Sequence, residues 1–163
     1  MIFSIFGKPE VLKRLREEIN SVIKSDKDIN VENFKKLPYL ECVMSETSRL
    51  FNPAANLFQR ELIQDTTLGG VPIEKGVLFD SIMVNQFHDP NIFKDPFEFI
   101  PERWESGTPT QEQTRLISMM FGGGPRSCIG KNLALVNSKV MTIKFLQRYA
   151  SVIEEGIQDG NNR

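Results

Sequence analysis

The sequence is poor in the residues that build disulfide frameworks and metal sites. Among its 163 residues it has one histidine, His88, and two cysteines, Cys42 and Cys128. Two cysteines do not make a disulfide scaffold, so we expect both to be reduced thiols. A zinc site needs more clustered Cys and His ligands than this chain offers. Any metal chemistry must therefore rest on a single soft ligand together with something that a cofactor supplies.

The chain also lacks an excess of charge of either sign and any long apolar run. Its 20 Lys and Arg residues oppose 21 Asp and Glu residues, which gives a net charge of −1. General nucleic-acid binders carry a basic surplus, so we expect no nucleic-acid partner. No apolar stretch approaches the length of a membrane span. We therefore expect this piece to be soluble or peripheral, and to reach a membrane only through an N-terminal anchor on a longer parent chain.

Hydrophobic periodicity predicts a mainly α fold with a small β region, an α+β class. One amphipathic helix is predicted from Pro9 to about Ser25 and a second from Pro38 to about Phe51. A long helix after residue 130 should run to about Tyr149. Its apolar residues lie nearly all round, which predicts burial. Residues 154–163 are expected to form a frayed tail.

The segment between the second and third helices changes period. Short β-type runs at residues 57–63, 71–73 and 76–84 are separated by turn signals such as Gly69-Gly70. This pattern predicts two or more antiparallel hairpin strands. Residues 89–110 are rich in proline, which predicts an irregular meander. Its aromatic residues predict that the meander packs onto a core: Phe93, Phe97, Phe99 and Trp104.

The most specific segment is the glycine-rich loop Phe121-Gly-Gly-Gly-Pro-Arg-Ser-Cys-Ile-Gly130 before the long helix. A thiolate ligand needs a site that stabilises negative charge, and a helix N-terminus provides free N–H groups and a positive dipole end. By itself, a lone cysteine before an apolar helix is usually a small buried hydrophobe. A glycine-rich loop before a helix can also hold phosphate, but this loop lacks the Lys-Ser/Thr of a P-loop.

Taken as a unit, this loop resembles the haem-binding signature of the cytochromes P-450, Phe-x-x-Gly-x-Arg-x-Cys-x-Gly. All five defining positions are present: Phe121, Gly124, Arg126, Cys128 and Gly130. The resemblance implies that residues 121–130 form the haem-ligand loop and that Cys128 is the axial thiolate ligand of the haem iron. It also implies that Phe121 shields the thiolate and that Arg126 pairs with a haem propionate. A thiolate ligand favours O–O cleavage.

Two further segments resemble elements of the same family. Glu46-Thr-Ser-Arg49 resembles its Glu-x-x-Arg, and Pro101-Glu-Arg-Trp104 resembles its Pro-Glu-Arg-Phe, with Trp where Phe is common. The resemblance implies a buried charged triad of Glu46, Arg49 and Arg103 that supports folding and cofactor retention. Judged alone, an i, i+3 Glu/Arg pair is usually a solvated surface pair that contributes little.

Arg60, in the β region, has two interpretations of about equal weight. The resemblance implies that it reaches a haem propionate, whereas an exposed arginine on a strand is the plain alternative. The resemblance covers nearly all of residues 1–163. It matches them to the C-terminal part of the P-450 fold, from the end of the long central helix through the haem-ligand loop and the helix that follows it.

The activity that the resemblance implies is that of a haem-thiolate monooxygenase. Such an enzyme uses O2 and two electrons from a reductase to oxygenate a small organic or lipophilic substrate. The reductase would dock on the proximal face near Arg126 and Lys131. Two alternatives stay open, namely peroxide-driven oxidation or isomerisation without a reductase, and a truncated product without function.

Beyond the haem ligand, we expect no catalytic residue in this chain, because the family's acid–alcohol pair belongs to the preceding helix. We expect the chain alone to bind haem poorly and to lack turnover. The sequence resembles the membrane-bound eukaryotic members of the family more than the soluble bacterial ones. The parent protein is therefore expected at the endoplasmic reticulum membrane, facing the cytoplasm.

Overall fold

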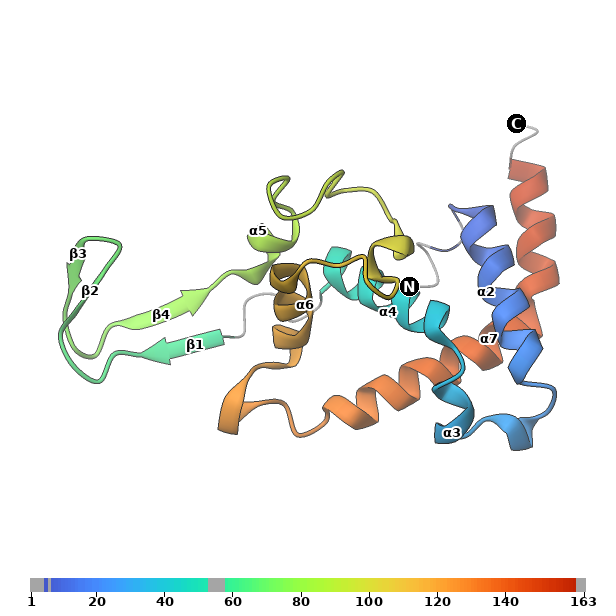
Figure 1. Ribbon diagram of the computed structural model, residues 1–163, viewed down its shortest axis with the longest axis horizontal. Coiled ribbons are helices and arrows are strands. Elements are labelled where there is room, and N and C mark those ends of the chain that lie inside the picture. The colour runs from blue at the N-terminus through green and yellow to red at the C-terminus, as the bar shows by residue number, and fades with distance from the viewer. Residues whose placement is uncertain (1–4, 6, 53–57, 161–163) are drawn as a thin grey trace.

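The computed structural model describes residues 5, 7–52 and 58–160. Helices form a body, and two small antiparallel sheets project from it as a long arm (Figure 1). The chain enters through helix α2 (Pro9–Val22), continues through the helical turns η1 (Asp26–Asp28) and α3 (Val31–Phe34), and reaches helix α4 (Pro38–Leu50). The two predicted N-terminal helices are thus confirmed, within one to three residues at their C-terminal ends.

Local chemistry explains why α2 and α4 form where they do. Each helix begins with a proline at its first position, where the missing N–H leaves no hydrogen bond unmade. The amphipathic spacing of α2 buries Leu12, Leu15 and Ile19. The Glu18 carboxylate of α2 accepts hydrogen bonds from the first amides of α4, at 2.7 and 2.9 Å. One helix therefore caps the N-terminus of the next.

Helix α7 (Lys131–Gly160) lies across the α2/α4 pair (Figure 1). It contributes Ile143 and Leu146 to the shared core. The prediction of a largely buried helix holds for only part of its surface, because Leu133 is 66% exposed and Met141 is 69% exposed. Only one face of α7 meets the other helices of the described chain. The frayed tail predicted from residue 154 is wrong up to Gly160, since no proline interrupts the helix there.

The predicted hairpin strands are confirmed as two sheets of two strands each. Strand β1 (Phe58–Glu61) pairs antiparallel with β4 (Leu78–Ser81), and β2 (Thr66–Leu68) pairs with β3 (Val71–Ile73). Gly69 and Gly70 close the inner hairpin at φ +57° and +85°, a conformation that favours glycine. The last predicted strand ends at Ser81 instead of residue 84, and the short helix α5 (Met83–Phe87) follows it. Leu57 lies outside the described residues.

The meander after α5 is irregular, as predicted, apart from one turn, η2 (Pro101–Trp104). Phe93 and Phe99 are buried and Trp104 packs against them, whereas Phe97 is 74% exposed, contrary to expectation. Helix α6 (Gln111–Ser118) was not predicted. Thr110 and Gln113 begin it with a capping box, and the turns η3 (Met119–Phe121) and η4 (Gly124–Arg126) lead into α7.

The molecule exposes much surface for its size. Its solvent-accessible area is 10992 Å². A compact protein of this mass exposes roughly 8,200 Å² by the usual scaling with mass. The extended β arm and the uncovered face of α7 explain the difference. None of the helices in the described ranges is both long and apolar enough to cross a membrane.

Replacing Leu15 with alanine should destabilise the helical body strongly. The side chain is fully buried between α2 and its neighbours, so its loss leaves a cavity. We expect the free energy of unfolding to fall by about 2–5 kcal/mol, measured by urea denaturation. Leu133→Ala is the matched control, because that leucine is 66% exposed, and it should change stability by less than about 0.5 kcal/mol. Equal losses in both variants would contradict the core described above.

Candidate functional site

The carboxylate of Glu46, on α4, is fully buried and fully hydrogen-bonded. It accepts bonds of 2.9–3.0 Å from Arg49 Nε and Nη2, from Arg103 Nε, from the Ile100 amide and from the Trp104 indole. A carboxylate has about four lone-pair sites, so these donors satisfy it completely. The structure thus brings together Glu46, Arg49 and Arg103, the three residues that the sequence grouped as a triad.

Arg49 is as completely satisfied as its partner. Its side chain is 0% exposed. Besides the two bonds to Glu46, it donates to the backbone carbonyls of Phe87 at 2.7 Å, Pro96 at 2.6 Å and Glu98 at 3.1 Å. All five guanidinium N–H groups therefore have acceptors. These bonds fix the end of α5 and the meander to α4.

Arg103 and Trp104 close the same cluster from the meander side. Arg103 Nη2 donates to the carbonyl of Asp95 at 2.8 Å. Asp95 has φ +49°, a left-handed conformation that costs a non-glycine residue energy. The Trp104 indole N–H was missed by sequence reasoning. The signal was the tryptophan itself, which stands where the family commonly has phenylalanine and adds a donor that phenylalanine lacks.

Competing effects set the pKa of Glu46. Burial acts to raise it, whereas the hydrogen bonds from Arg49, the Ile100 amide and Trp104, with the charge of Arg49, act to lower it. The balance lowers the pKa below that of a free glutamate, so the carboxylate is charged at neutral pH. By contrast, burial raises the pKa of the Cys42 thiol to about 11, which keeps that thiol neutral.

The glycine-rich loop presents Cys128 at the surface just before α7. The Cys128 amide donates to the Phe121 carbonyl at 2.7 Å, and its carbonyl accepts from the Lys131 amide at 3.3 Å. The thiol is exposed, as is Arg126, while Phe121 is half-buried. A Cβ atom added at Gly123 or at Gly124 would meet no heavy atom within 4 Å. The loop backbone therefore faces open space.

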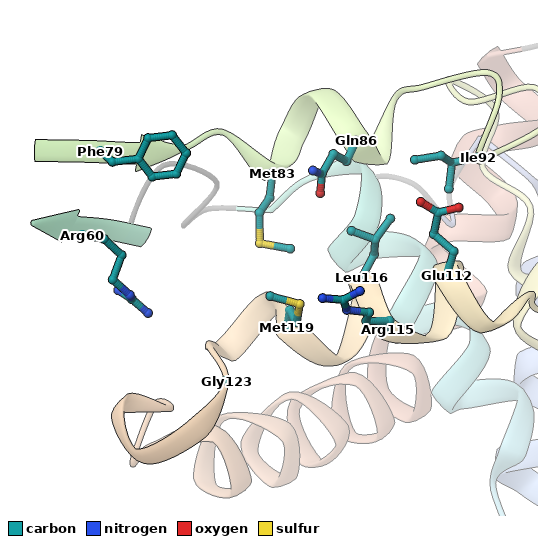
Figure 2. Close-up of a pocket in the computed structure, with 10 residues that line it drawn as sticks. All are labelled: Arg60, Phe79, Met83, Gln86, Ile92, Glu112, Arg115, Leu116, Met119 and Gly123. Atoms are coloured by element: carbon teal, nitrogen blue, oxygen red, sulfur yellow. The ribbon is translucent and has the colours of Figure 1, made fainter. Parts of the chain in front are cut away.

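A pocket of about 520 Å³ lies between β1, β4, α5 and α6, next to this loop (Figure 2). Its lining includes Arg60 and Gly123, so the structure brings the strand arginine to the edge of the glycine-rich loop. Phe121, Arg126 and Cys128 do not line it. A set of apolar side chains forms its walls, among them Phe79, Met83, Leu116 and Met119. The volume is in the range of small-molecule sites.

The sequence model of the cytochrome P450 family matches residues 1–161 of this chain. The chain belongs to the cytochrome P450 family. It is 36% identical over 151 residues to mouse cytochrome P450 4V2, a match that covers 91% of this chain and 28% of the relative. It is 34% identical over 149 residues to the mitochondrial cholesterol side-chain cleavage enzyme of Hypanus americanus, with 91% and 28% covered. The chain thus spans just over a quarter of these cytochromes P450.

Membership of the cytochrome P450 family implies haem as the cofactor, and the residues present fit it. A haem-thiolate site needs one cysteine as the axial ligand of the iron, and the exposed Cys128 thiol just before α7 could supply it. The two propionates need cationic donors, and both Arg60 and Arg126 are exposed. The loop at Gly123 and Gly124 leaves room for a flat macrocycle to approach the backbone.

Replacing Trp104 with phenylalanine tests the hydrogen bond that this cytochrome P450 adds to its triad. The ring remains, but Glu46 loses one charge-assisted bond of 2.9 Å. We expect the free energy of unfolding to fall by about 1.5–3 kcal/mol in thermal or urea denaturation. Tyr149→Phe, on an exposed ring of α7, should change it by less than about 0.5 kcal/mol. If Trp104→Phe leaves the free energy of unfolding unchanged, the indole N–H does not support the triad.

The stability of the fold should depend on pH through Glu46. Its folded pKa is lowered, so its contribution is fully present above the unfolded pKa of about 4.3 and is lost as the pH falls through the folded pKa. Glu46→Gln should cost about 3–5 kcal/mol at pH 7, because it leaves Arg49 buried without its counter-charge. The difference in the free energy of unfolding between the wild type and Glu46→Gln should become smaller below about pH 4.3.

Urea midpoints measured from pH 7 to pH 3 check this dependence. Glu32→Gln is the matched control, since Glu32 is exposed and pairs with Lys35 on the surface. That variant should follow the wild type within about 0.5 kcal/mol at every pH. A constant gap between wild type and Glu46→Gln across the whole range would contradict the lowered pKa.

Proposed function

We propose that the protein of which these residues form part is a haem-thiolate monooxygenase, with Cys128 as the axial ligand of the haem iron. The observation that carries the proposal is the exposed Cys128 thiol in a glycine-rich loop at the start of α7. The fully satisfied triad supports the proposal, because it fixes the meander that precedes α6 and this loop. When bound, the haem supplies the activation of O2, with insertion of one oxygen atom and reduction of the other to water by two electrons.

The chain's own residues hold and polarise the ligand. The hydrogen bond from the Cys128 amide to the Phe121 carbonyl closes the loop and presents the sulfur outward. Helix α7 begins three residues later, at Lys131, and its N-terminal end favours a negative charge on that sulfur. Arg126 and Arg60 would hold the haem propionates. Within these residues we assign no further catalytic group, and the triad serves the fold and the retention of the cofactor.

An electron-donating reductase is the partner that this activity requires. Arg126, exposed in the loop, and Lys131, half-buried at the start of α7, are the residues we assign to its docking face. The substrate is proposed to be a small organic or lipophilic molecule. One relative carries the name of a cholesterol side-chain cleavage enzyme, which is consistent with a lipophilic class. Peroxide-driven oxidation or isomerisation without a reductase is the alternative haem-thiolate chemistry.

The ligand assignment is tested by the absorption spectrum of the reduced, carbon monoxide-bound form. Because the chain spans just over a quarter of its relatives, we expect weak binding, so haemin is supplied in excess to the purified chain. The wild type should give a strongly red-shifted Soret band, and Cys128→Ser should lose it, because an alcohol does not replace a thiolate ligand.

Cys42→Ser is the matched control, since it removes the other thiol, which is buried and neutral. It should keep the band. A band that survives in Cys128→Ser and disappears in Cys42→Ser would move the ligand to α4. A wild-type chain that binds haemin but gives the same spectrum as Cys128→Ser would overturn the ligand assignment.

A further inference from the structure

The pocket in Figure 2 contains two arginines on facing walls. Arg60 enters it from β1 and Arg115 from α6, and their guanidinium groups point toward one another on either side of Met119. The Arg60 guanidinium donates to the carbonyl of Gln59 at 2.8 Å. Within the part of the chain that the structure describes, neither guanidinium has a carboxylate partner. The sequence singled out Arg60 but assigned nothing to Arg115.

The side of the pocket that faces Arg60 and Arg115 has no carboxylate among the lining residues that the structure describes. The pocket's one carboxylate, Glu112, lies beside Ile92 at the end opposite Arg60 (Figure 2). An anion held between two guanidinium groups of one pocket would interact favourably with both of them. The walls between them are apolar, since Met83 and Leu116 are buried in the adjoining cluster. An anion with an apolar body therefore suits the pocket better than a small hydrated ion.

The contacts of α6 with its neighbours explain why Arg115 lies at the pocket. Gln113 on α6 donates from its side chain to the carbonyl of Ile92 at 2.6 Å. Leu116 packs beside Met83 and Phe93 in the buried cluster. These contacts fix both the position and the rotation of α6. Arg115, the residue before Leu116, is thereby held at the pocket edge that faces β1.

We propose that Arg115 is a second carboxylate-binding residue of this pocket, which acts opposite Arg60 on a propionate of the porphyrin. The inference rests on the proposed function, because it takes the ligand to be haem. It differs from the sequence-based assignment, which placed the propionates on Arg60 and Arg126. The structure groups Arg60 with Arg115 in one pocket, and Arg126 does not line that pocket. Guanidinium groups suit this role because they bind carboxylates through two parallel hydrogen bonds.

The test uses iron-free protoporphyrin IX, which Cys128 does not ligate, and its dimethyl ester, which has no carboxylate. Binding to the full 163-residue chain is followed by quenching of its single tryptophan. The wild type should bind the free acid more tightly than the ester. Arg115→Gln should weaken binding of the free acid about tenfold, as expected for one lost charge-assisted bond, and leave binding of the ester unchanged.

Two further variants complete the experiment. Arg115→Lys keeps the charge but loses the planar fork, so its affinity should fall between those of the wild type and Arg115→Gln. Arg148→Gln makes the same change of net charge on the exposed surface of α7 and should bind as the wild type does. Circular dichroism of Arg115→Gln should match that of the wild type, since the side chain is exposed.

Three outcomes would overturn the inference: equal affinity of wild type and Arg115→Gln for the free acid, an equal loss for the ester, or binding of neither compound. Because these porphyrins lack iron, the result is independent of the Cys128 ligand. If porphyrin binding does not depend on Arg115 but the haemin experiment gives a normal thiolate spectrum, only the role proposed for Arg115 is overturned. If porphyrin binding depends on the carboxylates and on Arg115 but bound haemin gives no thiolate spectrum, the assignment of Cys128 as ligand is overturned and the role of Arg115 stands.

Discussion

The burial of one carboxylate, that of Glu46, is the constraint on which the rest of the structure depends. Removing a charged group from water costs several kcal/mol, so the chain must bring enough donors to it. The donors come from α4 itself and from three positions of the meander: Ile100, Arg103 and Trp104. An irregular segment without regular backbone pairing is thereby fixed in one conformation. The left-handed Asp95, whose carbonyl accepts from Arg103, is part of that conformation.

The influence of this cluster extends to the pocket through Arg49. Its bond to the Phe87 carbonyl holds the end of α5, and α5 contributes Met83 to the pocket wall. Phe93, whose ring lies 5.0 Å from the Arg49 guanidinium, packs with Leu116 of α6. Helices α5 and α6 therefore take their places from the same buried ion pair. The triad therefore helps to determine where the walls of this pocket lie.

Local signals made much of the fold predictable from the sequence. Prolines at the first helical positions and the spacing of Leu12, Leu15 and Ile19 predicted α2, and Gly69-Gly70 predicted the inner hairpin. Helix α6 was missed because it is short and its only buried apolar residue is Leu116. Its position depends on long-range contacts such as that of Gln113 with Ile92, which no local pattern encodes. The burial of α7 was overestimated for a related reason, since periodicity shows that a helix has several apolar faces but not what covers them.

The candidate site was predictable to the extent that its residues lie in one motif. Residues 121–130 are contiguous, and the two halves of the triad are short motifs of their own, so all of them could be recognised. Trp104 and the Ile100 amide were missed as partners of Glu46 because hydrogen bonding depends on how the meander folds back on α4. Arg115 was missed because no motif contains it, and only the packing of α6 brings it opposite Arg60.

Burial and hydrogen bonding separate the polar groups that serve the fold from those that a ligand could reach. Glu46 and Arg49 are fully buried, and their hydrogen-bonding capacity is used within the chain, so they leave nothing for a ligand. Arg60, Arg115 and the Cys128 thiol are exposed, and neither guanidinium has a carboxylate partner in the described residues. The two arginines line a pocket with apolar walls, whereas Cys128 is not among the residues that line it. Cationic groups that a fold leaves without a carboxylate partner beside such a space are those that an anionic ligand can pair with.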